Sequence, residues 1–325
     1  MNHTTDERTT LLQAWINQHY DMDEKSFNAV SGDASFRRYF RFIAKDVESK
    51  DNVSFIAVDA PPQLESSQTF INIAQLLAKN NVPVPTIYKY DLERGFYTQE
   101  DFGNQLLLES LNDQTADQLY IQAINHIADM QKVDSTSLPI YDSQLLQTEM
   151  NLFTDWFLIK HLNLSLTEKQ IDILRACYEL LEKNALEQPQ VFVHRDYHSR
   201  NIMMLDNNCL GIIDFQDAVK GPISYDLVSL LRDCYINWPQ DKLKQWIYYF
   251  HQHYTNDIPL DTFTRWFDLM GIQRHLKATG IFCRLNYRDG KPNYLDDVPR
   301  TLNYIKQVSE KYIELSELNK LIKPL

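Results

Sequence analysis

Hydrophobic and polar positions alternate with two different periods along the chain, and this change of period divides it in two. Short apolar runs such as YFRFIA (39–44) and VSFIAV (53–58) are separated by turn residues and predict strands. Residues 66–81 instead place apolar side chains three and four positions apart, which predicts a helix. Residues 11–19 predict a short opening helix on the same grounds, and residues 82–103 predict two more strands around a turn.

Helical spacing dominates after residue 103. It predicts a series of helices within residues 115–133, 143–162, 167–186, 223–236, 242–254, 261–282 and 298–318. Strand-like runs at 191–193, 202–205 and 209–214 interrupt this series and predict an embedded hairpin. We therefore predict an α+β fold with two lobes: a small β-rich lobe over residues 1–103 and a larger helical lobe over 104–325.

Composition narrows the class of protein. The 325 residues are 44% hydrophobic, which is enough for a sizeable core, and the net charge is −12. An acidic chain of this kind is a poor ligand for nucleic acid or an anionic membrane surface, since both attract basic proteins. No stretch of 18 apolar residues and no secretory leader pattern occurs, so we expect a cytoplasmic protein. The four cysteines show no metal-binding spacing and are interpreted as buried, reduced thiols.

The stretch VHRDYHSRNIMMLDNNCLGIIDFQDA (193–218) carries the candidate chemistry. Asp196 lies in a polar loop, Asn201 at the start of the predicted hairpin and Asp214 at its end, so we expect the three side chains to converge. Phosphoryl transfer uses such a set, because one carboxylate orients the attacking hydroxyl while an amide and a second carboxylate bind magnesium. The alternative is a surface hairpin with polar ends, which the combination of three spaced residues disfavours.

The same residues resemble a known family. HRDYHSRN matches the H-x-D-x-x-x-x-N catalytic loop of kinase-like proteins, and IDFQDA stands where protein kinases have D-F-G. The missing glycine and the stretch GPISYDLVSLLRD are similar to the aminoglycoside phosphotransferase branch. The stretches GDASFRRYFR, VDAPP and CRLNYRDGKPNYLDDVPRTLNYI are similar to bacterial anomeric kinases that act on N-acetylmuramate and N-acetylglucosamine in cell-wall recycling.

The resemblance implies a two-lobed kinase-like fold, ATP and Mg²⁺ as cofactors, and roles for individual residues. Asp196 would be the catalytic base, and Asn201 and Asp214 the magnesium ligands. Gly32 and Ser35 in the loop SGDAS would cover the nucleotide phosphates. Backbone groups of Glu100 and Phe102, in a hinge formed by QEDFG, would bind adenine.

One position departs from the family pattern. Kinase-like folds usually carry a lysine or arginine on the third strand, whereas FIAVDAPP places Val58 or Asp59 there. We therefore expect Arg37, Arg38 or Arg41 on the preceding strand to contact the phosphates, with Arg37 assigned to the nucleotide site, or magnesium to do most of this work.

The acceptor is described less closely by the sequence. His198, Gln216 and Arg284 are candidate acceptor-binding residues, and an arginine near 284 would suit a sugar with a lactyl carboxylate. Alternatives are a kinase for choline, homoserine or an aminoglycoside, which the acidic charge would suit, and a nucleotide-binding scaffold without catalysis. The oligomeric state is left open.

Overall fold

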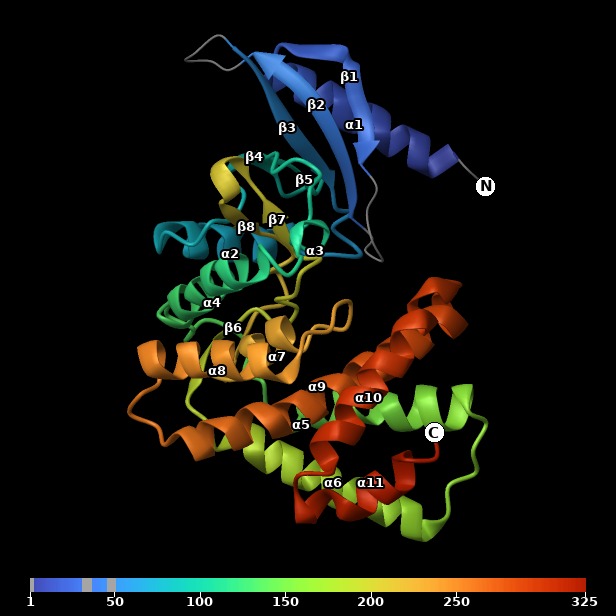
Figure 1. Ribbon diagram of the computed structural model, residues 1–325. Coiled ribbons are helices and arrows are strands. Elements are labelled where there is room, and N and C mark those ends of the chain that lie inside the picture. The colour runs from blue at the N-terminus through green and yellow to red at the C-terminus, as the bar shows by residue number, and fades with distance from the viewer. Residues whose placement is uncertain (1–2, 31–36, 46–50) are drawn as a thin grey trace. The chain divides into compact units, whose positions relative to one another are not determined.

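The computed structural model describes residues 3–30, 37–45 and 51–325, with side chains from residue 7 onward (Figure 1). Packing divides the chain into two compact units. The first contains Met1–Gln105 and Ile202–Gln216, and the second contains Leu106–Asn201 and Asp217–Leu325. The hairpin 202–216 thus groups with the first unit, although the sequence placed it in the second lobe. A folding boundary at residue 103 stays a prediction.

A five-stranded antiparallel sheet in the order β1-β2-β3-β5-β4 forms the first unit. Its strands are β1 (Met22–Val30), β2 (Arg38–Lys45), β3 (Asn52–Asp59), β4 (Ile87–Asp91) and β5 (Phe96–Glu100). The other elements are α1 (His3–His19), α2 (Ser67–Lys79) and the hairpin of β7 (Ile202–Met204), η2 (Asp206–Asn208) and β8 (Leu210–Ile212).

The helix α1 is held against the sheet by apolar and ionic contacts. Leu12, Trp15 and Ile16 are buried in one core cluster with Phe42 and Phe55 of the sheet. This burial follows from the apolar spacing of the helix, which places the three side chains on one face.

The buried carboxylate of Asp59 adds the ionic contacts of α1. It accepts hydrogen bonds from Nε of Arg8 on the helix at 2.9 Å and from Nε of Arg38 on β2 at 3.0 Å. The third-strand position that carries a cation in related folds is therefore a structural anchor in this chain.

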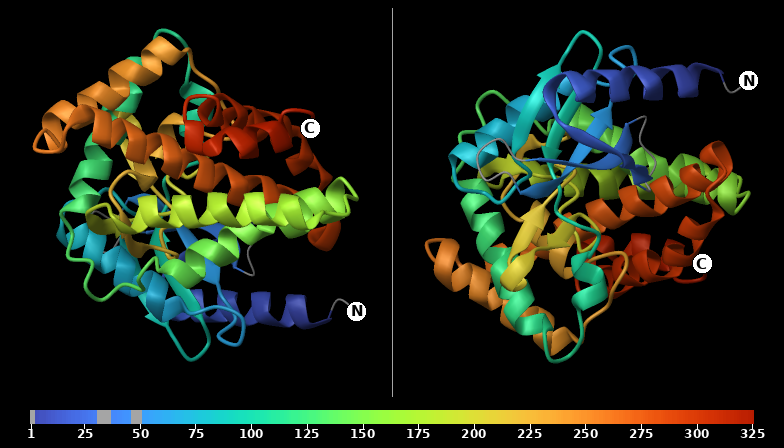
Figure 2. Two further views of the ribbon diagram at one scale, coloured as in Figure 1. Left: turned by 90° about the horizontal axis from the view of Figure 1, so that it is seen from below. Right: turned by 90° about the horizontal axis from the view of Figure 1, so that it is seen from above.

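The second unit is mostly helical and is built around the 30-residue helix α9 (Leu260–Asp289) (Figure 2). The helices that pack on it are α5 (Ser143–Leu152), the π-helix η1 (Phe153–His161), α6 (Glu168–Leu186), α7 (Tyr225–Leu231), α8 (Gln240–Tyr254), η3 (Pro292–Asp297) and α10 (Val298–Ser309). The other helices of the unit are α3 (Leu107–Ser110), α4 (Ala116–Gln131), η4 (Ile313–Leu315) and α11 (Ser316–Ile322). A short antiparallel pair, β6 (Gln190–Val193) and β9 (Val219–Pro222), completes the unit.

Close packing at the middle of α9 depends on a glycine. A Cβ atom at Gly280 would collide with the backbone of Leu152, at the end of α5. The glycine therefore permits the close approach of the two helices, at the usual entropic cost of glycine in a helix.

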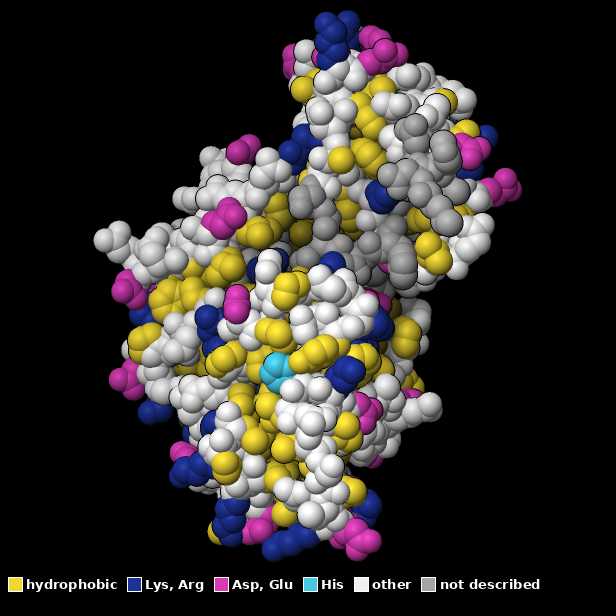
Figure 3. All heavy atoms as spheres, turned by 90° about the vertical axis from the view of Figure 1, so that its right-hand side faces the viewer, with side chains coloured by type: hydrophobic (Ala, Val, Ile, Leu, Met, Phe, Trp, Pro, Cys, Tyr) yellow, Lys and Arg dark blue, Asp and Glu magenta, His cyan; other side chains and the backbone are white. Residues whose placement is uncertain are grey.

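The sequence-based assignment of strands followed by helices, with an embedded hairpin, is confirmed, and so is the predicted fold class. The prediction of buried thiols is correct for Cys177, Cys234 and Cys283 but wrong for Cys209, which is exposed because it follows the tight turn η2. None of the described helices combines the length and apolar character needed to cross a lipid bilayer. Acidic and basic side chains are interspersed on the face shown in Figure 3.

Candidate active site

The loop from His194 to Asn201 connects β6 to β7 and has an unusual backbone. Arg195 adopts a positive φ of 77°, which is uncommon for a residue with a side chain. The carboxylate of Asp226 on α7 stabilises this geometry, because it accepts hydrogen bonds from the backbone N–H of His194 at 2.7 Å and of Arg195 at 3.1 Å. The buried Asp226 therefore braces the loop from the helix that follows β9.

A second carboxylate holds the far half of the loop. Asp233 is buried, and its Oδ2 accepts hydrogen bonds from the backbone N–H of Ser199 at 2.9 Å and from its hydroxyl at 2.5 Å. Its Oδ1 accepts from the N–H of Tyr235 at 2.9 Å. The loop is thus fixed at two points by carboxylates from outside it.

Within the loop, the predicted residues Asp196, His198 and Asn201 come together. Nδ2 of Asn201 donates to the backbone carbonyl of Asp196 at 3.0 Å, and the N–H of His198 donates to the same carbonyl at 3.1 Å. The first bond orients the amide, so that Oδ1 is the atom of Asn201 suited to bind a metal. A preorganised loop of this kind holds its side chains in one geometry before a substrate binds.

The charges near Asp196 keep its carboxylate ionised. Burial raises the pKa of Asp196, but Lys277, His198 and Arg274 lower it by more, so the pKa lies well below its ordinary value. The pKa of His198 is lowered to about 4, mainly by burial, so His198 is neutral near pH 7. Asp196 as a whole is partly exposed rather than wholly enclosed.

A buried network supports these cations. Glu149 on α5 forms ion pairs with Arg195 and with Nζ of Lys277, the latter at 3.0 Å. It also accepts a hydrogen bond from the hydroxyl of Tyr141. Lys277 donates to the hydroxyl of Tyr225 at 3.2 Å. Buried ionic groups need such partners, because an unpaired charge in a protein interior is strongly unfavourable.

In the first unit, Asp214 follows β8 and has a positive φ of 65°. Nε2 of Gln216 donates to Oδ1 of Asp214 at 2.9 Å, so the structure brings these two predicted residues together. Between them, the ring of Phe215 is fully buried and stacks on Phe70 of α2, with ring centroids 4.8 Å apart. This stacking fixes the backbone that presents Asp214.

Arg37 lies in the same part of the first unit. It is 6% exposed, its Nε lies 2.6 Å from Oε2 of Glu65, and its guanidinium covers the ring of Phe70 at 5.1 Å. The charges of both Arg37 and Asp214 act on the hydroxyl of Tyr39. Burial raises the pKa of Tyr39, Arg37 lowers it, and Asp214 raises it.

The two other arginines of β2 have structural partners. Arg38 pairs with Asp59, as described above. Arg41 forms two hydrogen bonds with Asp101, from Nε at 2.6 Å and from Nη2 at 2.8 Å, and also donates to the side chain of Asn104 at 2.8 Å. Arg41 therefore fixes the segment after β5 rather than extending toward a ligand.

That segment contains the predicted hinge. The backbone N–H of Glu100 donates to the carbonyl of Thr86 at 2.9 Å, so this N–H already has a partner in β4–β5. The ring of Phe102 packs on β8, because a Cβ atom at Gly211 would lie only 2.5 Å from its Cε2. Of the predicted nucleotide contacts, Gly32 and Ser35 lie outside the described residues.

The predicted acceptor residue Arg284 lies on α9 and is partly buried, with no hydrogen-bond partner for its Nε among the described residues. Ten residues separate it from Arg274 on the same helix, which corresponds to about 15 Å along the helix axis. The structure therefore does not place Arg284 with the cations around Asp196.

The candidate metal ligands, Asp214 and Asn201, are of the type that magnesium binds. Among the residues that the structure describes, no group of three or more His, Cys, Asp or Glu side chains is arranged to hold a metal. Magnesium usually binds one or two protein oxygens and completes its shell with water and substrate phosphates. The carboxylate of Asp214 in the first unit and the amide oxygen of Asn201 in the second are each ligands of the kind that magnesium takes.

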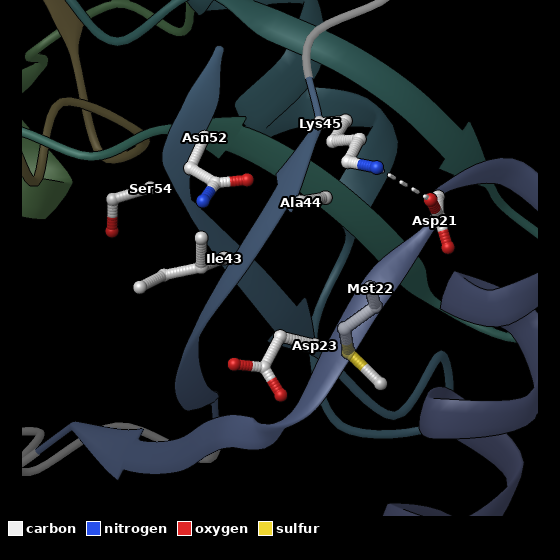
Figure 4. Close-up of a pocket in the computed structure, with 8 residues that line it drawn as sticks. All are labelled: Asp21, Met22, Asp23, Ile43, Ala44, Lys45, Asn52 and Ser54. Carbon is white, nitrogen blue, oxygen red and sulfur yellow. Dashed lines mark ion pairs between the residues drawn. The ribbon is translucent and has the colours of Figure 1, made fainter. Parts of the chain in front are cut away.

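A hollow of about 390 Å³ lies elsewhere on the first unit (Figure 4). Its lining comes from β1, β2, β3 and their ends: Asp21, Met22, Asp23, Ile43, Ala44, Lys45, Asn52 and Ser54. Lys45 and Asp21 form a loose ion pair of 3.8 Å at its rim. The hollow includes none of the residues predicted to act on a substrate.

Comparison with known proteins identifies the family. The model of the phosphotransferase enzyme family matches residues 26–266, which include the whole braced loop. This chain belongs to that family. The N-acetylmuramate/N-acetylglucosamine kinase of Pseudomonas putida is 40% identical, over 98% of this chain and 97% of that protein.

Solved structures of phosphotransferases share the fold at low sequence identity. The choline kinase LicA of Streptococcus pneumoniae has a TM-score of 0.63 at 13% identity, over 93% of this chain and 99% of that one. An ADP-bound aminoglycoside phosphotransferase has a TM-score of 0.61 at 14% identity, over 90% of this chain and 97% of that one. At this identity the likeness establishes the kinase-like fold alone.

Sequence reasoning missed the residues that support the loop from a distance. Glu149, Asp233, Arg274 and Lys277 are all buried, yet none lies in the motif. One feature of the sequence could have indicated two of them: Arg274 and Lys277 are cations three residues apart in a largely uncharged part of α9. Such spacing places both on one helix face.

Proposed function

We propose that this phosphotransferase transfers the γ-phosphoryl group of ATP to the anomeric hydroxyl of N-acetylmuramate and N-acetylglucosamine, giving sugar 1-phosphates for peptidoglycan recycling. The observation that carries the proposal is the 40% identity to the Pseudomonas putida kinase over nearly the full length of both proteins. The braced loop with Asp196 and Asn201 supports retention of catalysis and argues against a non-catalytic scaffold. The need for ATP would place the reaction in the cytoplasm.

In this proposal Asp196 orients the sugar hydroxyl and receives its proton. Its lowered pKa makes it a weak base, which suits a loose transition state in which the hydroxyl proton leaves late. The main contribution of Asp196 is then positioning, because a carboxylate within about 2.6–3.2 Å of the hydroxyl aligns it with the phosphorus atom.

Among Arg37, Arg38 and Arg41, Arg37 is the best candidate for the nucleotide phosphates. Arg38 and Arg41 on β2 are held by Asp59 and Asp101, whereas Arg37, one residue before β2, pairs with Glu65, just before α2. Protein kinases use a lysine on the third strand paired with a glutamate of the following helix. Here an arginine from the second strand and Glu65 would form the equivalent pair.

The adenine would bind at the segment after β5. Because the N–H of Glu100 already donates to Thr86, we propose the carbonyl of Glu100 and the N–H of Phe102 as the adenine contacts. Gly32 and Ser35 remain our candidates for the loop over the phosphates.

Asn201 and Asp214 would hold magnesium, which neutralises charge on the transferring phosphates when bound. Gln216 would keep the carboxylate of Asp214 in position through its 2.9 Å hydrogen bond, in addition to the acceptor contact predicted from the sequence. His198, neutral near pH 7, would contact the acceptor as a hydrogen-bonding group rather than as a charge.

The charges around Asp196 favour this acceptor class over the alternatives. Lys277, Arg274 and Arg195 are close enough to Asp196 to lower its pKa. Choline and aminoglycosides are cationic, whereas N-acetylglucosamine is neutral and N-acetylmuramate is an anion. In this proposal the nearby cations suit a neutral or anionic acceptor better than a cationic one.

The proposal is tested by measuring ADP release and product structure over a panel of acceptors. N-acetylmuramate and N-acetylglucosamine should be phosphorylated to acid-labile 1-phosphates, and their methyl glycosides, in which the anomeric hydroxyl is blocked, should be inert. Turnover of choline, homoserine or an aminoglycoside with neither sugar active would refute it, and phosphorylated methyl glycosides would place the transfer on another hydroxyl.

A further inference from the structure

Arg274 on α9 is a buried cation with an incomplete set of partners. Its side chain is 5% exposed, and its Nη1 donates to the sulfur of Cys234 at 3.4 Å. Its Nε has no hydrogen-bond partner among the residues that the structure describes. A thiol is a weak acceptor, so this guanidinium lacks the strong partners that buried charges normally have.

Arg232 provides a comparison within the same unit. It is similarly buried, at 4% exposed, but it pairs with the carboxylate of Asp268 and stacks over the ring of Phe267 at 4.6 Å. A structural arginine in this core is therefore paired with an acid. Arg274 lacks such a carboxylate, which points to a ligand that supplies one.

The position of Arg274 connects it to the candidate active site. It lies one helical turn from Lys277, on the same face of α9. Its partner Cys234 directly follows Asp233, which holds Ser199 of the loop at 2.9 Å. The charge of Arg274 also lowers the pKa of Asp196 and of His198.

The charges of Asp196 and Asp233 raise the pKa of Arg274, but within the described part of the chain no hydrogen bond joins it to either carboxylate. Both oxygens of Asp233 are used by the N–H and hydroxyl of Ser199 and the N–H of Tyr235. Glu149 is shared by Arg195 and Lys277. An incoming carboxylate would find in Arg274 a fork of N–H donors, the group best matched to a carboxylate.

We infer that Arg274 binds the lactyl carboxylate of N-acetylmuramate and so determines how strongly the enzyme prefers this acidic sugar over N-acetylglucosamine. The inference rests on the proposed function, because both sugars would use the same site and the same hydroxyl. They differ at the lactyl ether, so only one of them brings a carboxylate to Arg274. The assignment moves carboxylate recognition from Arg284, the residue that the sequence suggested, to Arg274.

The first test changes the substrate and leaves the protein intact. The methyl ester of N-acetylmuramate keeps the size of the lactyl group but removes its charge. With the wild-type enzyme, esterification should lower kcat/KM by about tenfold or more, in line with loss of a charge-assisted contact. Equal kcat/KM for acid and ester would overturn the inference.

The second test combines the ester with substitutions. In Arg274→Gln, the ratio of kcat/KM for N-acetylmuramate to that for N-acetylglucosamine should fall by about tenfold or more, and acid and ester should become equivalent. The ratio in Arg274→Lys should lie between those of the wild type and Arg274→Gln, because lysine keeps the positive charge but not the forked pair of N–H donors. The matched control is Arg265→Gln on the same helix, whose partner is Glu314 at 3.1 Å and whose loss should leave the ratio unchanged.

The outcomes separate the inference from the proposed function. Wild-type enzyme inactive on both sugars would refute the proposed function. The inference alone would be overturned if Arg274→Gln and Arg274→Lys lowered kcat/KM for the two sugars by the same factor. It would also be overturned if the ratio of the two kcat/KM values changed in Arg284→Gln but not in the Arg274 variants. Should Arg274→Gln fail to fold, Arg274→Lys and the wild-type comparison of acid with ester decide the question.

Discussion

Arg37 and Glu65 form an ion pair inside the first unit, with Nε of Arg37 2.6 Å from Oε2 of Glu65. The pair lies beside the stacked rings of Phe70 and Phe215, and Phe215 directly follows Asp214. The third-strand position meanwhile carries Asp59, which binds Arg8 and Arg38. In the proposed nucleotide site, Arg37 and Glu65 would therefore stand in for the third-strand cation and its glutamate partner.

Arg37→Ala should raise the apparent KM for ATP by about tenfold or more, since a charge-assisted contact to phosphate is lost. Steady-state kinetics at saturating sugar would measure this. The matched control is Arg38→Ala, which breaks the pair with Asp59 and should lower the melting temperature with a smaller effect on KM for ATP. An unchanged KM in Arg37→Ala would mean that magnesium and backbone groups suffice.

Gly211→Ala should weaken ATP binding without unfolding the protein. The added Cβ would lie 2.5 Å from Cε2 of Phe102, so the ring must move and take the proposed adenine contact with it. Isothermal calorimetry with ATP would show a rise in Kd. Combining Gly211→Ala with Phe102→Leu should recover part of the affinity for ATP, because the smaller leucine side chain leaves room for the added Cβ. A double variant that binds ATP as weakly as Gly211→Ala would show that the clash with Phe102 is not the cause.

Asp196→Asn should keep the fold and lose most activity, because the amide neither carries the charge nor accepts the proton. Loss of such a group costs about 10²–10⁴-fold in rate. Single-turnover measurement of sugar phosphate would quantify the loss, and an unchanged melting temperature would exclude unfolding. Turnover near that of the wild type would contradict the proposed role.

The rate with N-acetylglucosamine should not fall between pH 8 and pH 5 through titration of the loop. The pKa of Asp196 is lowered, so its carboxylate is protonated only well below the ordinary range, and His198, with a pKa of about 4, stays neutral above pH 5. A profile of kcat/KM against pH checks this. An acidic limb near pH 6 that disappears in His198→Gln would show that His198 titrates higher than this and that its protonation inactivates the enzyme.

Several features follow from the local sequence. The strands and helices are encoded by apolar periodicity, and the loop HRDYHSRN is encoded by a short motif whose spacing is set by one turn between two strands. Asp196, His198 and Asn201 are brought together by bonds within eight residues, so sequence reasoning could find them. The fold class and family were predicted on the same local basis.

Other features depend on side chains distant in sequence. Whether Arg37, Arg38 or Arg41 could bind a phosphate depended on the positions of Asp59, Glu65 and Asp101, which lie on other elements. The low pKa of Asp196 likewise comes from Arg274 and Lys277, about 80 residues away along the chain. Periodicity and motifs specify local backbone and burial, whereas the pairing of charges depends on distances that only the folded chain fixes. The tertiary structure therefore decided which acid pairs with each arginine and how strongly the carboxylate of Asp196 is held ionised.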